Sequence, residues 1–144
     1  MATLNIQGEL GSRLTINVHG YESDAPGDPY DANWLLCSAE VDVGRFHGVV
    51  DASFMTRDFA RFLTELDHVV TRANLVASFQ TMEEVLSVRV EVDRAGRAVV
   101  SGRLREIDVG GSDLSFAFES DLSYLKRTLE ELRRIVSEFP ERAA

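Results

Sequence analysis

Four oxygen-bearing side chains gather in one short stretch of this sequence: Asp24, Asp28, Asp31 and Asn33. Carboxylate and amide oxygens are the ligands that calcium prefers, so the stretch has the composition of a cation-binding loop. The EF-hand order of acids, its central glycine and its closing glutamate are all missing, however. Two prolines in the same stretch indicate a rigid, solvated loop instead. The sequence therefore favours a loop that binds no metal.

The three histidines and the single cysteine show no spacing typical of a metal or nucleophile site. His19, His47 and His68 fall in different predicted elements, and the sequence contains no HExxH, HxH or CxxC pattern. A zinc site would have to be assembled by the fold alone. Cys37 lies on the apolar side of a predicted strand, where burial raises the pKa of a thiol and makes it inert. One cysteine excludes an intramolecular disulfide and agrees with a reducing compartment.

The carboxylates and glycines offer no catalytic motif either. Glu83 and Glu84 are adjacent ahead of a predicted strand, so their side chains should point to opposite sides and cannot act together on one substrate. The pair Gly110-Gly111 lacks the lysine and the helix start of a phosphate-binding loop. The sequence also lacks the Gly-x-Ser-x-Gly motif of serine hydrolases. These observations predict a protein that is not an enzyme and uses no cofactor.

The charge balance is acidic and narrows the class of partner. The 144 residues include 15 Lys and Arg against 24 Asp and Glu, a net charge of −9. Residues 1–72 hold 5 basic and 11 acidic residues, so the excess leans toward the N-terminal half. Such a balance opposes binding to nucleic acid, because that affinity comes mainly from Lys and Arg on phosphates. It favours rapid capture of basic proteins.

Neither a targeting segment nor a membrane span is predicted. The N-terminal residues lack the basic part and the continuous apolar part of a signal peptide. No apolar run approaches the roughly 20 residues that a spanning helix needs. We therefore expect a cytoplasmic protein with no membrane partner.

Alternation of apolar and polar residues predicts four antiparallel strands in the first third of the chain. They are expected near residues 4–6, 13–19, 33–43 and 46–50, with one long loop over 21–32. A helix should follow from Thr56, a good N-cap, to about Arg72, with Asp58 in its first turn where the helix dipole favours an anion.

The second half predicts four more strands and a closing helix. The strands are expected around 75–79, 86–93, 97–107 and 114–118, and a glycine turn over 93–96 joins the middle two. Ser120 or Asp121 should cap the last helix, and Pro140 should end it. Its apolar stripe spans fewer than three heptads, which favours packing on the sheet over a dimer.

The elements together predict an α+β fold. It should hold about eight mainly antiparallel strands, as one curved sheet or a sandwich, with two amphipathic helices, one after the fourth strand and one C-terminal. The length fits a single domain over residues 1–144. The sequence shows no repeat, linker or low-complexity tract.

Trp34 is the only tryptophan and begins the third predicted strand. Alternation places it opposite the apolar side that Leu35 and Cys37 share. Trp34 and Leu36 could pack under a helix on a second face of the sheet, which is the interpretation we favour. Alternatively, Trp34 is partly exposed next to Asp31, as an aromatic anchor with the polar rim typical of an interaction hot spot.

Several segments resemble the WapI-type bacterial immunity proteins and related small domains. They are Tyr30-Asp31-Ala32-Asn33-Trp34-Leu35, Met55-Thr56 at a helix start, and Phe139-Pro140-Glu141-Arg142 at the end. Gly20-Tyr21, the region from Phe79 through Glu83-Glu84 to Leu86, and Leu114-Ser115-Phe116 occur in matching order. The resemblance spans nearly the whole chain. It implies a protein that binds and neutralises the toxic C-terminal domain of a polymorphic toxin, often a nuclease.

The chemistry of the side chains, rather than the resemblance, selects a candidate partner-binding site: Asp24, Asp28, Tyr30, Asp31 and Trp34. An acidic inhibitor can approach a basic nuclease cleft by electrostatic steering and cover it. We therefore expect a non-enzymatic monomer or weak dimer that forms a stoichiometric complex with a toxin domain. The alternative is a small ligand-binding or regulatory module with a pocket between sheet and helix.

Overall fold

Two four-stranded antiparallel sheets form the body of the protein. The computed structural model describes residues 1–24, 29–107 and 110–142. The first sheet has the order β1 (Ala2–Gln7), β2 (Arg13–Tyr21), β3 (Trp34–Val43) and β4 (Phe46–Met55). The second has the order β5 (Val76–Gln80), β6 (Leu86–Val92), β7 (Arg97–Arg105) and β8 (Asp113–Asp121). We call these sheets the first and the second meander.

Two long helices and two short helical segments complete the described fold. Helix α2 (Thr56–Val70) follows β4, and α3 (Leu122–Glu138) follows β8. A 3-10 turn, η1 (Glu9–Gly11), joins β1 to β2, and the short helix α1 (Pro29–Ala32) precedes β3. These elements confirm the predicted α+β class, its eight strands and the places of its two long helices. No helix among the described residues is both long and apolar enough to cross a membrane.

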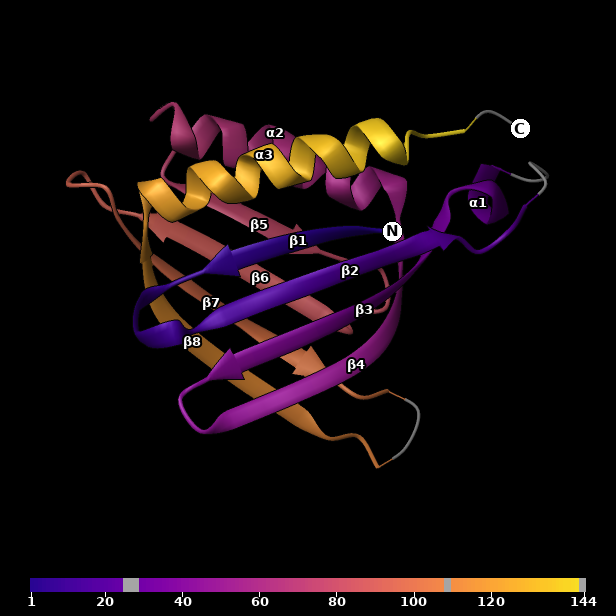
Figure 1. Ribbon diagram of the computed structural model, residues 1–144, viewed down its shortest axis with the longest axis horizontal. Helices are drawn as coiled ribbons and strands as arrows, with labels where there is room; N and C mark the ends of the chain where they lie inside the picture. The colour runs from indigo at the N-terminus through magenta and orange to yellow at the C-terminus, as the bar shows by residue number, and fades with distance from the viewer. Residues whose placement is uncertain (25–28, 108–109, 143–144) are drawn as a thin grey trace.

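The two meanders pack face to face, and the helices lie side by side along one flank of this sandwich (Figure 1). Every second residue of each strand faces the other sheet, and most of these residues are buried, which is the alternation that the sequence predicts. The largest fully buried side chains come from both sheets and both helices, and include Phe54, Phe59, Phe62, Phe79, Leu14, Leu86 and Leu125. Four of these rings meet edge to face or tilted, at centroid distances of 5.3 to 6.2 Å.

The chain runs through the same unit twice, four strands and then a helix, although its sequence shows no repeat. Each helix covers the first strand of the other unit: α2 packs on β5, and α3 packs on β1 (Figure 1). The Thr128 hydroxyl donates to the Asn5 carbonyl at 2.7 Å, and a Glu131 carboxylate oxygen accepts from the Asn5 N–H at 2.9 Å. On the other side Glu65 accepts from the Ser78 N–H at 3.1 Å. Helix side chains therefore bond to backbone groups on the open edges of β1 and β5.

The helix ends agree with the sequence except at one position. Asp121 caps α3 by accepting from the Tyr124 N–H at 3.1 Å, and α3 ends at Glu138, just ahead of Pro140, as predicted. Helix α2 begins at Thr56 itself, so the N-cap is Met55 and the predicted Thr56 cap is wrong by one residue. Asp58 accepts from the Met55 N–H at 2.9 Å and does the capping from inside the helix.

Candidate functional site

Four of the segments that carry the family resemblance meet at one end of the sandwich. The end of β2, the start of β3, the first turn of α2 and the C-terminal tail lie against one another there. The Tyr21 and Phe139 rings meet edge to face, with their centroids 5.6 Å apart. The Asn33 carbonyl accepts from the Thr56 N–H at 3.0 Å, which joins the loop before β3 to the start of α2.

Asn33 is the centre of this junction and is only 2 % exposed. Its side-chain Oδ1 accepts from the Arg142 N–H at 2.7 Å, and its Nδ2 donates to the Arg142 carbonyl at 3.0 Å. The Asn33 side-chain amide thus bonds to both backbone groups of Arg142, as a neighbouring strand would. A buried asparagine that uses both ends in this way holds a fixed orientation, because a flipped amide would turn its NH₂ toward an N–H and its oxygen toward a carbonyl.

The Arg142 side chain ties the same tail to the loop. Its Nε donates to the Ala32 carbonyl at 2.9 Å, and one of its terminal nitrogens donates to the Ser23 carbonyl at 2.8 Å. The guanidinium lies 3.7 Å from the centroid of the Tyr21 ring, a cation–π contact. Burial raises the pKa of Tyr21, and the Arg142 charge acts in the opposite direction. We refer to Tyr21, Asn33 and Arg142 as the tail clamp.

The predicted partner-binding residues differ in how far the structure describes them. Asp24 and Asp31 are exposed and lie next in sequence to Ser23 and Ala32, whose carbonyls accept from Arg142. Trp34 is partly exposed at the first position of β3. The backbone of Tyr30 belongs to α1, whereas Asp28 lies outside the described residues. Leu36 is 50 % exposed, so its predicted packing under a helix is wrong. The alternative, a partly exposed Trp34 on the outer side of the strand, agrees with the structure.

Sequence reasoning missed the charged surface that adjoins Trp34. The outer side of the first meander, which we call the acidic face, carries four carboxylates against one guanidinium, and they are Glu22, Glu40, Asp42, Asp51 and Arg13. The Glu22 carboxylate accepts from the Ser53 hydroxyl beside Leu36, and Asp42 pairs with Arg13 at 3.6 Å. Residue parity along each strand indicates the outer side, but which carboxylates become neighbours depends on the pairing register.

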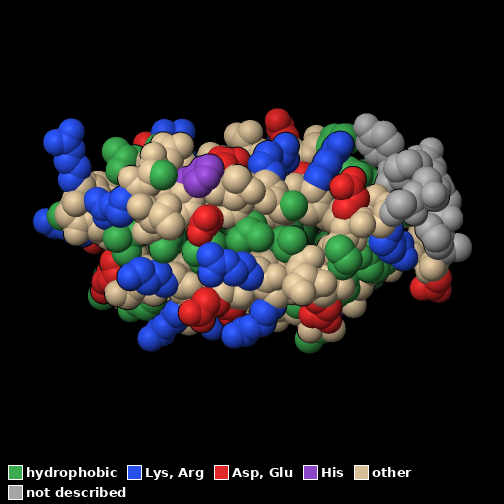
Figure 2. All heavy atoms as spheres, turned by 90° about the horizontal axis from the view of Figure 1, so that it is seen from above, with side chains coloured by type: hydrophobic (Ala, Val, Ile, Leu, Met, Phe, Trp, Pro, Cys, Tyr) green, Lys and Arg blue, Asp and Glu red, His purple; other side chains and the backbone are tan. Residues whose placement is uncertain are grey.

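The other surfaces balance their charges. On the outer side of the second meander Arg89 pairs with Glu91 at 2.8 Å, and Arg103 pairs with Asp113. This pairing raises the pKa of Arg103 and lowers that of Asp113. Over the two long helices, basic and acidic side chains are interleaved (Figure 2). Of these three surfaces, the outer side of the first meander therefore carries the largest acidic excess.

One cluster on the acidic face has the composition of a metal site. Glu40, Asp42 and His47 each offer a ligand atom, and these atoms lie within 4.8 Å of one another. The His47 Nε2 is 2.8 Å from a Glu40 oxygen and 3.7 Å from an Asp42 oxygen. The hydrogen bond with Glu40, helped by the Asp42 charge, raises the pKa of His47. The β3–β4 hairpin creates this cluster, which the spacing of the histidines in the sequence did not show.

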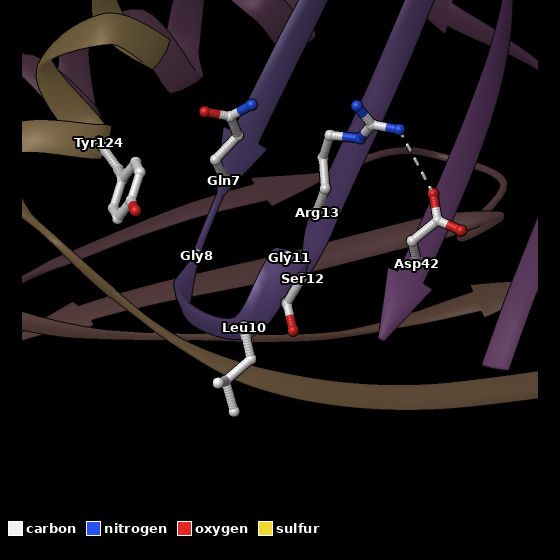
Figure 3. A pocket seen from close by; sticks show the side chains of 8 residues that line it. All are labelled: Gln7, Gly8, Leu10, Gly11, Ser12, Arg13, Asp42 and Tyr124. Atoms are coloured by element: carbon white, nitrogen blue, oxygen red, sulfur yellow. Dashed lines mark ion pairs between the residues drawn. The ribbon is translucent and has the colours of Figure 1, made fainter. Parts of the chain in front are cut away.

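Two further features of the described residues are the buried cysteine and a hollow on the surface. Cys37 is buried on the inner side of β3, as predicted, and burial raises the pKa of its thiol to about 12. A hollow of about 590 Å³ lies between the β1–β2 turn and the start of α3, lined by Gln7, Leu10, Arg13, Asp42 and Tyr124 among others (Figure 3). Its lining combines the exposed Gln7 and Leu10 with the Arg13–Asp42 ion pair and the buried Ser12, and it is an open surface depression.

Comparison with known proteins decides the family. The family described as "Immunity protein WapI-like family" matches residues 5–140 of this chain. The chain belongs to this WapI-like immunity protein family. No curated protein matches it. A crystal structure of Trypanosoma bruciei MRP1/MRP2 has a TM-score of 0.50 and 10 % sequence identity over 94 % of this chain and 83 % of that chain. At this identity the likeness concerns the fold alone.

The matched region of this WapI-like protein includes most of the tail clamp. Tyr21, Asn33 and the Tyr30–Leu35 stretch lie inside residues 5–140, and Arg142 lies two positions beyond. The predicted resemblance to WapI-type immunity proteins is therefore confirmed. Membership of this family points to toxin immunity.

Proposed function

We propose that this protein binds the toxic domain of a cognate polymorphic toxin and neutralises it as a stoichiometric complex, without catalysis. The WapI-like family match over residues 5–140 is the observation that carries this proposal. The partner is a cationic domain, and a nuclease fits this chemistry because it must hold an anionic substrate. The protein acts in the cytoplasm as a monomer or weak dimer, with all 144 residues in one domain.

The electrostatics of the acidic face support a cationic partner. Its carboxylates lie on one side of a rigid sheet, and one of them, Glu22, lies beside Trp34 and Leu36, which are partly exposed. Complementary charge steers association and raises the on-rate, whereas apolar anchors slow dissociation. A protein that must reach a toxin before the toxin reaches its target benefits from both.

The binding residues that we propose remain Asp24, Asp28, Tyr30, Asp31 and Trp34. The tail clamp supports this choice, because it fixes the backbone of residues 23 and 32 with hydrogen bonds from one arginine. A loop that is already held in place loses less conformational entropy on binding than a free loop. The short helix α1 lies inside the same segment and adds further order.

Co-expression with the toxin domains encoded next to this chain tests the proposal. The expected result is rescue of growth and a one-to-one complex with one of them. Neither rescue nor a complex with any neighbouring toxin would overturn the proposal.

Charge-neutral variants of the loop test the site. Asp24→Asn together with Asp31→Asn should slow association about tenfold at low salt, and added salt should remove the difference. Glu130→Gln, an exposed change on α3, is the matched control and should leave the rate unchanged. An unchanged rate in the double variant would exclude the loop from the interface while leaving the complex intact.

A further inference from the structure

The four outer strands of the two sheets are not equally covered. Helix side chains bond to Asn5 in β1 and to Ser78 in β5, and the turn after β1 lies against one end of β8, where the Ser120 hydroxyl donates to the Gln7 carbonyl at 2.7 Å. Strand β4 is ten residues long and pairs only with β3. No described segment covers the other edge of β4 with backbone hydrogen bonds.

The register identifies which backbone groups of β4 are open. The Thr56 N–H bonds to the Asn33 carbonyl, and the pairing then continues without a bulge from Trp34–Met55 to Val43–Phe46. In an antiparallel ladder bonded and non-bonded pairs alternate. The backbone groups that point away from β3 are therefore those of His47, Val49, Asp51 and Ser53. Met55 is next in this series, and its N–H does point away, to the Asp58 carboxylate.

An apolar groove adjoins this open edge. It has a volume of about 250 Å³, and its apolar lining comes from Phe46, Val50, Leu104 and Leu114. Phe46 is 70 % exposed and Val49 is 53 % exposed, so the edge presents large apolar side chains to solvent. Natural sheets usually protect such an edge with a proline, a lysine or a bulge, and β4 contains none of these.

We propose that the edge of β4 binds an extended segment of a cationic partner protein, which adds a fifth strand to the first meander. Alternate side chains of an added strand would point to the two sides of the sheet. Apolar residues would enter the groove beside Phe46 and Val50, and Lys or Arg residues would face the acidic face near Asp51. Under the proposed function, on which this assignment of the partner depends, the segment belongs to the toxin.

Charge decides against a second copy of this chain as the occupant. Antiparallel pairing of β4 with its own copy would join two acidic faces into one continuous sheet. Each face brings the same excess of carboxylates, and like charges brought together destabilise such an assembly. A basic segment removes this repulsion and fills the groove as well.

Amide hydrogen exchange with a peptide probe tests the edge without the toxin. The probe is acetyl-Lys-Val-Lys-Val-Lys-Val-Lys-amide, and its control replaces the central Val with Pro, which keeps the charge but breaks the ladder. At saturation the probe should slow exchange of the His47, Val49, Asp51 and Ser53 amides at least about tenfold. Equal protection by the control peptide, protection elsewhere, or none would overturn the proposal.

Two variants of the protein sharpen this test. Val49→Pro removes only an outward N–H, so it should fold and lose the protection, whereas Val49→Thr keeps the N–H and should retain it. Asp51→Lys keeps the backbone N–H and should weaken binding of the cationic probe peptide through charge repulsion alone. Full protection of Val49→Pro would overturn strand addition.

Growth rescue separates this proposal from the proposed function. If the wild type and Val49→Thr rescue but Val49→Pro does not, the toxin uses the edge. Rescue by Val49→Pro as well would overturn the assignment of the segment to the toxin and leave the immunity function standing. Failure of the wild type would overturn the immunity function, and the peptide result would still decide whether the edge binds a strand.

Discussion

Glu65 and Glu131 hold the same position in two different helices and perform the same task on opposite halves of the protein. Each is the tenth residue of its helix. Glu65 accepts from the Ser78 N–H at 3.1 Å, and Glu131 accepts from the Asn5 N–H at 2.9 Å. Helix α2, which follows the first meander, thus bonds to the first strand of the second meander, and α3, which follows the second, bonds to the first strand of the first. The two halves of the chain therefore interlock.

The bond from α3 to β1 predicts that substitution of Glu131 lowers stability, whereas substitution of its neighbour Glu130 does not. Glu131→Ala should lower the free energy of unfolding by about 1–2 kcal/mol, because it leaves the Asn5 N–H and the Asn5 side-chain amide without an acceptor. Glu131→Gln keeps one acceptor and should lose less. Chemical denaturation measures both.

The neighbouring exposed residue provides the control for this prediction. Glu130→Ala should change stability by no more than about 0.5 kcal/mol. Equal losses at positions 130 and 131 would show that helix propensity, rather than the bond to β1, explains the effect.

Local patterns predicted the elements of this fold because burial on one side leaves a period in the sequence. The alternation from Arg13 to His19 and the stripe from Leu122 to Phe139 both became the expected strand and helix. The charged turn Asp93–Gly96 also joined the expected pair of strands. Each of these signals lies within a few residues of the structure that it predicts.

Contacts between residues that are far apart in the chain leave no periodic pattern in the sequence. Asn33 and Arg142 are 109 positions apart, and nothing in either segment indicates that one amide will bind the backbone of the other. The repeated unit is equally hidden, since Glu65 and Glu131 match only when both helix starts are known. The candidate site was predicted as an acidic loop, but the acidic face beside it depends on the register of β2, β3 and β4.

The tail clamp predicts a large cost for a nearly isosteric change. Asn33→Asp keeps the shape but turns a donor into a carboxylate oxygen that faces the Arg142 carbonyl, so the variant should lose about 1–3 kcal/mol of unfolding free energy. Asn74→Asp is a suitable control, because Asn74 is exposed and its Oδ1, which accepts from the Leu75 N–H, is retained in Asp. Denaturant titration should show a shift only for position 33.

Arg142→Lys tests the same clamp from the tail. Lysine cannot reproduce the two directed bonds to Ser23 and Ala32, so amides of residues 22–24 and 31–33 should exchange faster. Unchanged exchange in this variant would mean that the loop holds its conformation without the tail.

The His47–Glu40 hydrogen bond predicts a pH dependence. The pKa of His47 is raised in the folded state, so the stabilisation that it provides is fully present below its ordinary value of about 6.5 and is lost as pH rises through the raised value. Glu40→Gln should lower the pKa of His47 toward the ordinary value, as followed by NMR titration of the ring. Glu119→Gln, on the outer side of β8, is the control. A pKa of His47 that stays raised in Glu40→Gln would assign the shift to Asp42 alone.

Leu10 predicts a variant that gains stability. It lies at the tip of η1 with a φ of 58°, a left-handed conformation that costs an L-residue about 1–2 kcal/mol, and its side chain is fully exposed. Leu10→Gly should therefore raise the free energy of unfolding by about 0.5–1 kcal/mol after the entropy that glycine loses on folding. Leu10→Ala keeps the strained backbone and should change little, whereas Gly11→Ala, at a φ of 75°, should destabilise by about 1 kcal/mol. Thermal and denaturant unfolding of the three variants measures these differences. A loss of stability in Leu10→Gly would show that the exposed leucine makes a stabilising contact that outweighs the strain in its backbone.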